Sequence, residues 1–190
     1  MSLAACLTTV APPPELGYHN PLDSLDGGTG ALDGGTLDGG GTSYSEGTVE
    51  GRSPDLTAAV YLVTGLDSGQ IRTELTLGDV AALCAFTQGN MLTPSYDLVS
   101  LRLAGDVPGP YPVGVALSPS GATASLQYHS DAGAFGTVPA ISGVIELDGV
   151  DPGNQQLAQG LYTLTFSATE TLSGRFLAEP CAGLSPPAGD

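Results

Sequence analysis

Lysine is missing from this 190-residue sequence, and four arginines oppose 20 acidic residues, for a formal net charge of −16. Nucleic-acid binding needs clustered Lys and Arg to neutralise phosphates, so this composition excludes a nucleic-acid partner. Adsorption to anionic lipid headgroups through a basic patch is excluded for the same reason. A protein of this composition would need an anchor to be held at a membrane.

Long apolar runs and catalytic signatures are also missing. No run approaches the roughly 18 apolar residues of a membrane-spanning helix, so we expect no such helix. The only histidines are His19 and His129, and no Gly-x-Ser-x-Gly nucleophile elbow occurs. We expect His129 on the solvated face of a strand, and the clustered ligands of a zinc site are not in supply. The sequence therefore predicts a protein without enzymatic activity or cofactor.

The first part of the chain has the composition of a tether. Residues 7–46 carry no positive charge and contain Pro12-Pro13-Pro14 and three Leu-Asp-Gly-Gly copies that begin at Leu25, Leu32 and Leu37. So much glycine with so few apolar side chains favours a disordered linker, spanning on the order of 35 Å root-mean-square. A calcium-binding β-roll would need a regular nonapeptide period, which these unevenly spaced copies do not have.

The rest of the chain alternates apolar and polar residues with period two. Short segments of this kind, separated by Gly, Pro and Asp, indicate a mainly β fold: an antiparallel β-sandwich or barrel of about eight or nine strands. The segments are 57–64, 71–77, 99–103, 113–117, 124–129, 141–148, 162–167 and a last strand around Phe176.

One segment, GDVAALCAFTQGN, breaks the alternation. Asp79 as N-cap and Gly89 as stop predict one short helix between them, lying across an open end of the β-layers. A buried strand is the alternative, because short apolar runs are ambiguous.

Three cysteines are present: Cys6, Cys84 and Cys181. If the two cysteines of the β-rich part pair, the one at the extreme N-terminus is left over. Such a bridge would clamp the last strand to the body of the domain. The alternative is two separately buried thiols, because free cysteine packs as a small hydrophobe.

Leu3-Ala4-Ala5-Cys6 resembles the lipobox of bacterial lipoproteins, in which an apolar and two small residues precede the cysteine that receives a diacylglycerol. The resemblance implies a lipid on Cys6 and a cell-envelope location, at the outer membrane or cell surface. The alternatives are that Cys6 is an incidental residue and that the protein is secreted or periplasmic. Residues 1–6 would be the remnant of an export signal, 7–46 a linker, 47–181 the β domain and 182–190 a flexible tail.

The β-rich part also resembles domains of uncharacterised bacterial lipoproteins over roughly residues 79–181. The matching stretches are 142–145 (SGVI), 162–166 (YTLTF), 172–176 (LSGRF) and Cys181. This resemblance implies that Cys84 pairs with Cys181 and that the domain is displayed at a surface. It implies no activity.

Carboxylates offer the remaining route to a chemical site. Asp148, Asp151 and Asn154 lie in a predicted hairpin loop and form a weak calcium candidate. Glu146 points outward beside them, and no glycosidase pair is identifiable. The hydroxyl-bearing residues Thr163, Thr165, Ser167 and Thr169 lie on an outward face, where solvation is the simplest role.

The sequence therefore predicts a non-enzymatic, lipid-anchored envelope protein with a binding or structural role, its membrane contact made through Cys6. The ligand, whether protein or glycan, is left open. The alternatives are a secreted or periplasmic enzyme that acts on carbohydrate through carboxylates, and a structural subunit of an envelope assembly.

Overall fold

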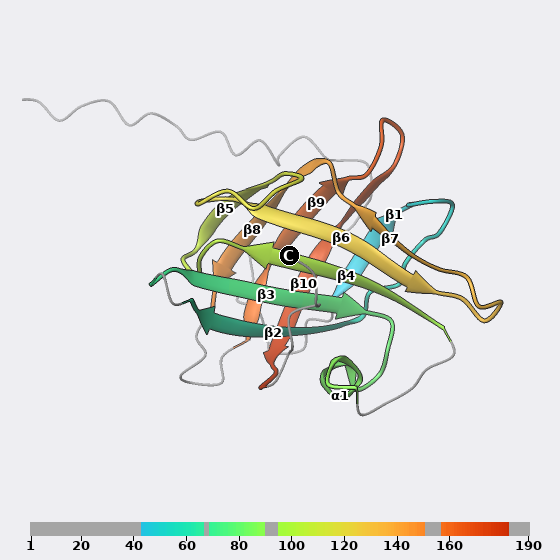
Figure 1. The fold of residues 1–190 in the computed structure, drawn as a ribbon, viewed down its shortest axis with the longest axis horizontal. Helices are drawn as coiled ribbons and strands as arrows, with labels where there is room; N and C mark the ends of the chain where they lie inside the picture. The colour runs from blue at the N-terminus through green and yellow to red at the C-terminus, as the bar shows by residue number, and fades with distance from the viewer. Residues whose placement is uncertain (1–42, 67–68, 90–94, 151–156, 183–190) are drawn as a thin grey trace, which may run out of the picture. The chain divides into compact units, whose positions relative to one another are not determined.

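The computed structural model describes residues 43–66, 69–89, 95–150 and 157–182 (Figure 1). These residues form ten strands and one short helix. In chain order they are β1 (Tyr44–Gly47), β2 (Ala58–Gly65), β3 (Ile71–Gly78), α1 (Leu83–Thr87), β4 (Tyr96–Leu103), β5 (Gly109–Val113), β6 (Ala122–His129), β7 (Phe135–Pro139), β8 (Ser142–Gly149), β9 (Ala158–Thr165) and β10 (Thr171–Pro180).

The strands make two layers that join into a closed barrel (Figure 1). The front layer contains β2, β3, β4 and β6, and the back layer contains β5, β8, β9 and β10. Within each layer every pairing is antiparallel. Strands β1 and β7 extend the layers beside β10 and β6, outside the ring of eight. The predicted mainly β class is confirmed, in its barrel form.

The layers meet at two seams, and both are short parallel pairings. At the first seam β10 pairs with β2 through only Glu179 and Pro180. At the second seam β5 pairs with β6 through the single pair Val113 and Ala122, with a hydrogen bond from the Gly114 N–H to the Ala122 carbonyl. Antiparallel ladders thus hold each layer, and the seams add little hydrogen bonding.

The core fills the space between the layers, as the period-two pattern predicts. On β3 the inward residues Thr73, Leu75 and Leu77 are fully buried, and on β9 Tyr162 and Leu164 are. The largest fully buried side chains are Tyr61, Tyr162, Phe176, Leu56, Leu75, Leu77, Leu101, Leu103, Leu126, Ile145, Leu147 and Leu164. Burial of this apolar surface is the main stabilising contribution to the fold.

Two glycines make room for the large rings of the back layer. Tyr162 lies opposite Gly174, and Phe176 lies opposite Gly160, in the β9–β10 ladder. A Cβ on Gly160 would come within 2.6 Å of the Phe176 ring and 2.0 Å of the Glu146 carbonyl oxygen. Each ring therefore covers a cross-strand glycine, an arrangement that fixes the register of this ladder.

Three strands differ from the sequence prediction. Strand β1 begins at Tyr44 and so crosses the predicted boundary between the linker 7–46 and the domain 47–181; the folded domain extends further toward the N-terminus and includes the buried Ser43. Strand β7 was not predicted. The segment predicted as a strand over 113–117 is instead β5, which ends at Val113, and Val115 beyond it is 78% exposed.

Prolines explain the error at β5. Pro110 and Pro112 lie inside this strand, although proline cannot donate to a ladder. They are tolerated because β5 is fully paired only with β8, while its other side makes the single-pair seam. The strand thus includes the two prolines, and the apolar–polar alternation of residues 113–117 lies at its end and beyond it rather than in a strand of its own.

The predicted helix is present but shorter, and its N-cap is wrong. Helix α1 follows Ala82, which adopts a left-handed conformation (φ 57°) and gives no side-chain cap. Asp79 instead accepts a hydrogen bond from the Asp97 N–H, which joins it to β4. Gly89 does end the helix: its φ is 73°, and its N–H donates to the Phe86 carbonyl.

Helix α1 covers a second, smaller core on the outer side of the front layer. Leu83 of the helix packs there with Val60, Val80, Leu98 and Cys181. The helix thus hides one end of the outer face of β2, β3 and β4, and among the described residues no helix or strand covers the other end (Figure 1).

Candidate binding face

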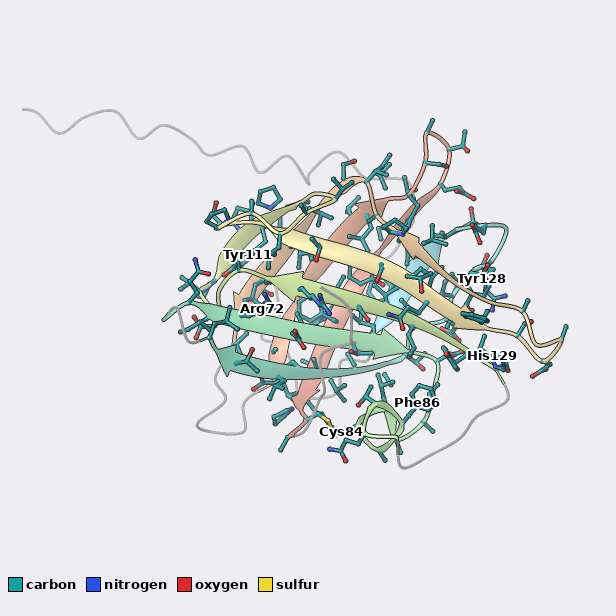
Figure 2. The ribbon with its side chains drawn as sticks, viewed as in Figure 1. Arg72, Cys84, Phe86, Tyr111, Tyr128 and His129 are labelled. Atoms are coloured by element: carbon teal, nitrogen blue, oxygen red, sulfur yellow. A yellow bond between two sulfur atoms is a disulfide. The ribbon has the colours of Figure 1, made fainter. Side chains whose placement is uncertain are left out.

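The uncovered end of the front layer carries two of the four arginines. Outward positions alternate with core positions along β3, β4 and β6, so polar side chains from three strands gather on one surface (Figure 2). We call this surface the arginine face. It consists of Arg72, Glu74, Ser100, Arg102, Thr123 and Ser125.

Strand register brings the charged groups together. Glu74 lies directly opposite Arg102 in the β3–β4 ladder, and Arg72 lies two residues along β3 on the same side. One oxygen of Glu74, Oε1, is 3.9 Å from a nitrogen of each arginine. The Glu74 residue is 8% exposed. A single buried carboxylate is therefore shared by two guanidinium groups, and the trio carries a net positive charge within a strongly acidic protein.

Arg72 has hydrogen-bonding capacity to spare. Its Nε is buried and has no hydrogen-bond partner among the described residues. At 3.9 Å the contact of Arg72 with Glu74 is an ion pair but too long for a hydrogen bond. A buried donor without a partner costs stability, so its persistence calls for an explanation.

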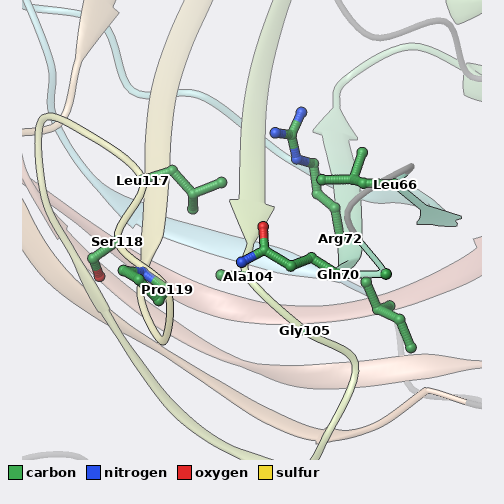
Figure 3. A pocket seen from close by; sticks show the side chains of 10 residues that line it. Leu66, Gln70, Arg72, Ala104, Gly105, Leu117, Ser118 and Pro119 are labelled. Atoms are coloured by element: carbon green, nitrogen blue, oxygen red, sulfur yellow. The ribbon is translucent and has the colours of Figure 1, made fainter.

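Two hollows adjoin the arginine face, and both are lined by Arg72 and Leu117. One, of about 510 Å³, lies between the ends of β3 and β4 and the segment 117–119. Figure 3 shows Leu66, Gln70, Arg72 and Leu117 around it, with the Gln70 carboxamide directed into the hollow. The other, of about 420 Å³, lies over Ser100, Arg102 and Ser125 below the segment 114–117. We call the two hollows together the groove, and Arg72 and Leu117 lie in the walls of both.

A second charged cluster lies at the far end of the front layer. Nη2 of Arg52 lies 2.7 Å from the Asp97 carboxylate, and the guanidinium carbon is 4.7 Å from the centroid of the Tyr128 ring. The Tyr128 hydroxyl donates to Glu50, and this hydrogen bond raises the pKa of the tyrosine. These groups satisfy one another, so the cluster stabilises the 49–52 turn against β4 and β6.

Aromatic rings line the outer surface at that same end. The ring centroid of Tyr96 is 5.1 Å from that of Phe86 and 5.8 Å from that of His129. His129 is on the outer face, as predicted, but it is half-buried against Tyr96 (Figure 2). Its cross-strand neighbour Phe135 is 81% exposed. Four residues of β6, roughly 13 Å, separate His129 from Ser125, the nearest member of the arginine face on that strand.

The structure confirms one predicted pair. Cys84 of α1 and Cys181 after β10 form a disulfide with a Cα–Cα distance of 5.6 Å. The Cys181 N–H also donates to the Tyr61 carbonyl beside the β2–β10 seam. Cys6, the predicted lipid attachment site, lies outside the described residues.

The calcium candidate is only partly within the structure. Asp148 lies in β8 with its side chain exposed, and Asp151 and Asn154 lie outside the described residues. Glu146 is exposed opposite Pro110 of β5. Within the described ranges no three His, Cys, Asp or Glu side chains are grouped to hold a metal ion.

The predicted outward hydroxyls lie on the back layer, away from the arginine face. Thr163 and Thr165 are on the outer side of β9, and Ser167 and Thr169 are in the turn before β10. Ser167 donates to Glu170 and so is used within its own turn. Among the helices that the structure describes, none is long and apolar enough to cross a membrane.

Sequence reasoning missed the arginine face because its members come from three separate strands. The alternation did place Arg72, Glu74 and Arg102 on polar faces. Their convergence depends on the pairing of β3 with β4, and α1 lies between those strands in the chain. The sequence feature that could have indicated this face is the rarity of arginine, which makes each arginine a candidate for a specific role.

Comparison with protein-family models, curated proteins and solved structures gives no match to this chain.

Proposed function

We propose that this chain is a non-enzymatic, lipid-anchored protein of the cell envelope whose barrel domain binds a ligand on the arginine face. The observation that carries the proposal is the Cys84–Cys181 disulfide. Disulfides persist in oxidising compartments outside the cytoplasm, so this bridge favours an exported protein.

The disulfide also supports Cys6 as the anchor point. It uses two of the three cysteines, and the third follows Leu3-Ala4-Ala5 at the start of an acidic, glycine-rich segment. A lipid on Cys6 would supply the membrane attachment that the acidic composition does not. Stable attachment requires more than one acyl chain, which a diacylglycerol provides.

The chemistry of the arginine face favours binding over catalysis. Guanidinium groups stay protonated and present a planar set of donors, which suits recognition of anions rather than proton transfer. The nearby hydroxyls of Ser100 and Ser125 would need a base to act as nucleophiles. Glu74 is held between two guanidiniums, and His129 lies four residues along β6 from Ser125, roughly 13 Å away. The groups on this face therefore hold a ligand rather than transform it.

The test of the anchor uses the protein expressed from its own chromosomal locus. We expect the mature chain to fractionate with membranes and its intact mass to include a diacylglycerol on Cys6. The matched control is Cys6→Ser, which should appear unacylated in the soluble fraction. An unmodified, soluble wild-type protein would overturn the lipid anchor.

A further inference from the structure

We propose that Arg72 and Arg102 together seat a carboxylate of an acidic glycan, such as a uronic-acid unit, with neighbouring sugar units lying in the groove on either side. The inference rests on the proposed binding role of the arginine face and adds the class of ligand.

The arrangement of charge fits a single added anion. Arg72 and Arg102 share the one carboxylate of Glu74, so the trio has one positive charge in excess. Glu74 holds the two guanidiniums close together on neighbouring strands, where they would otherwise repel each other. A ligand carboxylate in this place would be approached by two arginines and would balance the excess charge.

The guanidinium of Arg72 is not saturated by the protein. Its buried Nε has no hydrogen-bond partner among the described residues, and its Nη1 is 3.9 Å from Glu74, too far for a hydrogen bond. Guanidinium donors in a planar fork match the two oxygens of a carboxylate. The Arg72 side chain is 21% exposed, so the ligand oxygens would bind its terminal Nη groups rather than the buried Nε.

The groove around the arginines fits a hydroxyl-rich chain. Arg72 lines both of its hollows, so a linear ligand bound at this arginine would have room to extend into either one. Its walls combine hydrogen-bonding groups with small apolar surfaces, which match the hydroxyls and the C–H faces of sugars. The hydrogen-bonding groups are those of Gln70, Ser100, Ser118, Thr123 and Ser125, and the apolar surfaces are those of Leu66, Val115, Leu117 and Pro119.

The net charge of the protein limits how acidic the glycan can be. A net charge of −16 repels a long, densely charged polyanion, whereas at the arginine face two guanidiniums share one carboxylate. A glycan in which carboxylates alternate with neutral sugars places one charge at the arginines and few elsewhere. This spacing distinguishes the ligand that we propose from nucleic acids and heavily sulfated polymers.

The experiment measures binding of an oligosaccharide of alternating glucuronic acid and N-acetylglucosamine to the full-length protein by calorimetry. The same oligosaccharide with its carboxylates converted to methyl esters is the matched ligand control. We expect the acidic form to bind and the ester to bind at least about tenfold more weakly, because charge-assisted hydrogen bonds are lost.

Protein variants locate the site. Arg72→Gln and Arg102→Gln should each weaken binding of the acidic oligosaccharide by about tenfold or more. Arg72→Lys should keep part of the affinity, because it retains charge but loses the planar donors. The control is Arg175→Gln on β10 of the back layer, which should bind as the wild type does. Circular dichroism of each variant confirms that the barrel is folded.

Several results would overturn the inference. Equal binding of acid and ester, or unchanged binding by the folded Arg72→Gln variant, would show that no carboxylate sits at the arginines. An acidic peptide that binds this face in place of the oligosaccharide would refute the glycan class. No binding by a wild-type protein that is acylated on Cys6 would refute the ligand while leaving the anchor intact.

Discussion

Breaking the Cys84–Cys181 disulfide should cost about 4–5 kcal/mol of the free energy of unfolding. The bridge joins residues 97 positions apart, and closing a loop of that length in the unfolded chain removes roughly 16 cal/mol/K of entropy, or about 4.7 kcal/mol at 25 °C. Domains of this size are stable by about 5–15 kcal/mol, so the loss is a large share of the total.

The loss should be felt first at α1. This helix has five residues, too few to be stable alone, and the bridge holds it over the second core around Leu83 and Leu98. Without the bridge we expect amide hydrogen exchange to accelerate in residues 80–89 more than in the β3–β4 ladder.

The assay is urea unfolding of the double variant Cys84→Ala/Cys181→Ala in a Cys6→Ser background, compared with Cys6→Ser alone. Removing Cys6 from both proteins prevents exchange of disulfide partners. A loss below about 1 kcal/mol would refute the loop-closure argument, because it would place the effect of the bridge within the range of a single surface substitution. Unchanged exchange in residues 80–89 would refute the role of the bridge in docking α1.

Two further predictions concern the back layer. Gly160→Ala should lower the free energy of unfolding in urea by about 1–3 kcal/mol, because the added methyl would meet the Phe176 ring. The control is Gly149→Ala, which should be nearly neutral because a Cβ there meets nothing within 4 Å. Equal losses in the two variants would contradict the close packing at Gly160. Burial raises the pKa of Tyr162 above its usual value of 10, so above that pH the unfolded chain loses this proton first and stability should fall by up to about 1.4 kcal/mol per pH unit. Urea unfolding between pH 9 and pH 11, roughly on either side of the usual tyrosine pKa, should show this fall in the wild type and a shallower one in Tyr162→Phe, and parallel profiles would contradict it.

Local sequence was sufficient for the elements whose two faces differ. The alternation in 71–77 and 162–167 predicted that Leu75, Leu77 and Leu164 face the core, since one-sided burial imposes a period of two. The same pattern also placed Ile71 on the core face, and this was wrong: Ile71, at the start of β3, is 43% exposed. Gly89 ended the helix as expected, because a left-handed residue there suits glycine.

Elements defined by distant partners could not be predicted. Strand β1 exists because Tyr44 pairs with Arg175, far along the chain, and its own composition resembles the glycine-rich segment before it. Asp79 resembled an N-cap, but β4 supplied it with a backbone N–H, and the helix began later. The arginine face likewise required the register of β3 and β4, which single-strand patterns do not contain.

The two seams of the barrel differ in a way that matters for access to the groove. The β2–β10 seam is followed immediately by Cys181, whose disulfide to Cys84 ties the end of β10 to α1. The β5–β6 seam is fastened by one residue pair and leads directly into the 114–119 segment that overhangs Arg72. We therefore expect local opening of the barrel at the β5–β6 seam, beside Arg72, rather than at the β2–β10 seam. If the proposed glycan binds at the arginine face, this opening would widen the groove for it.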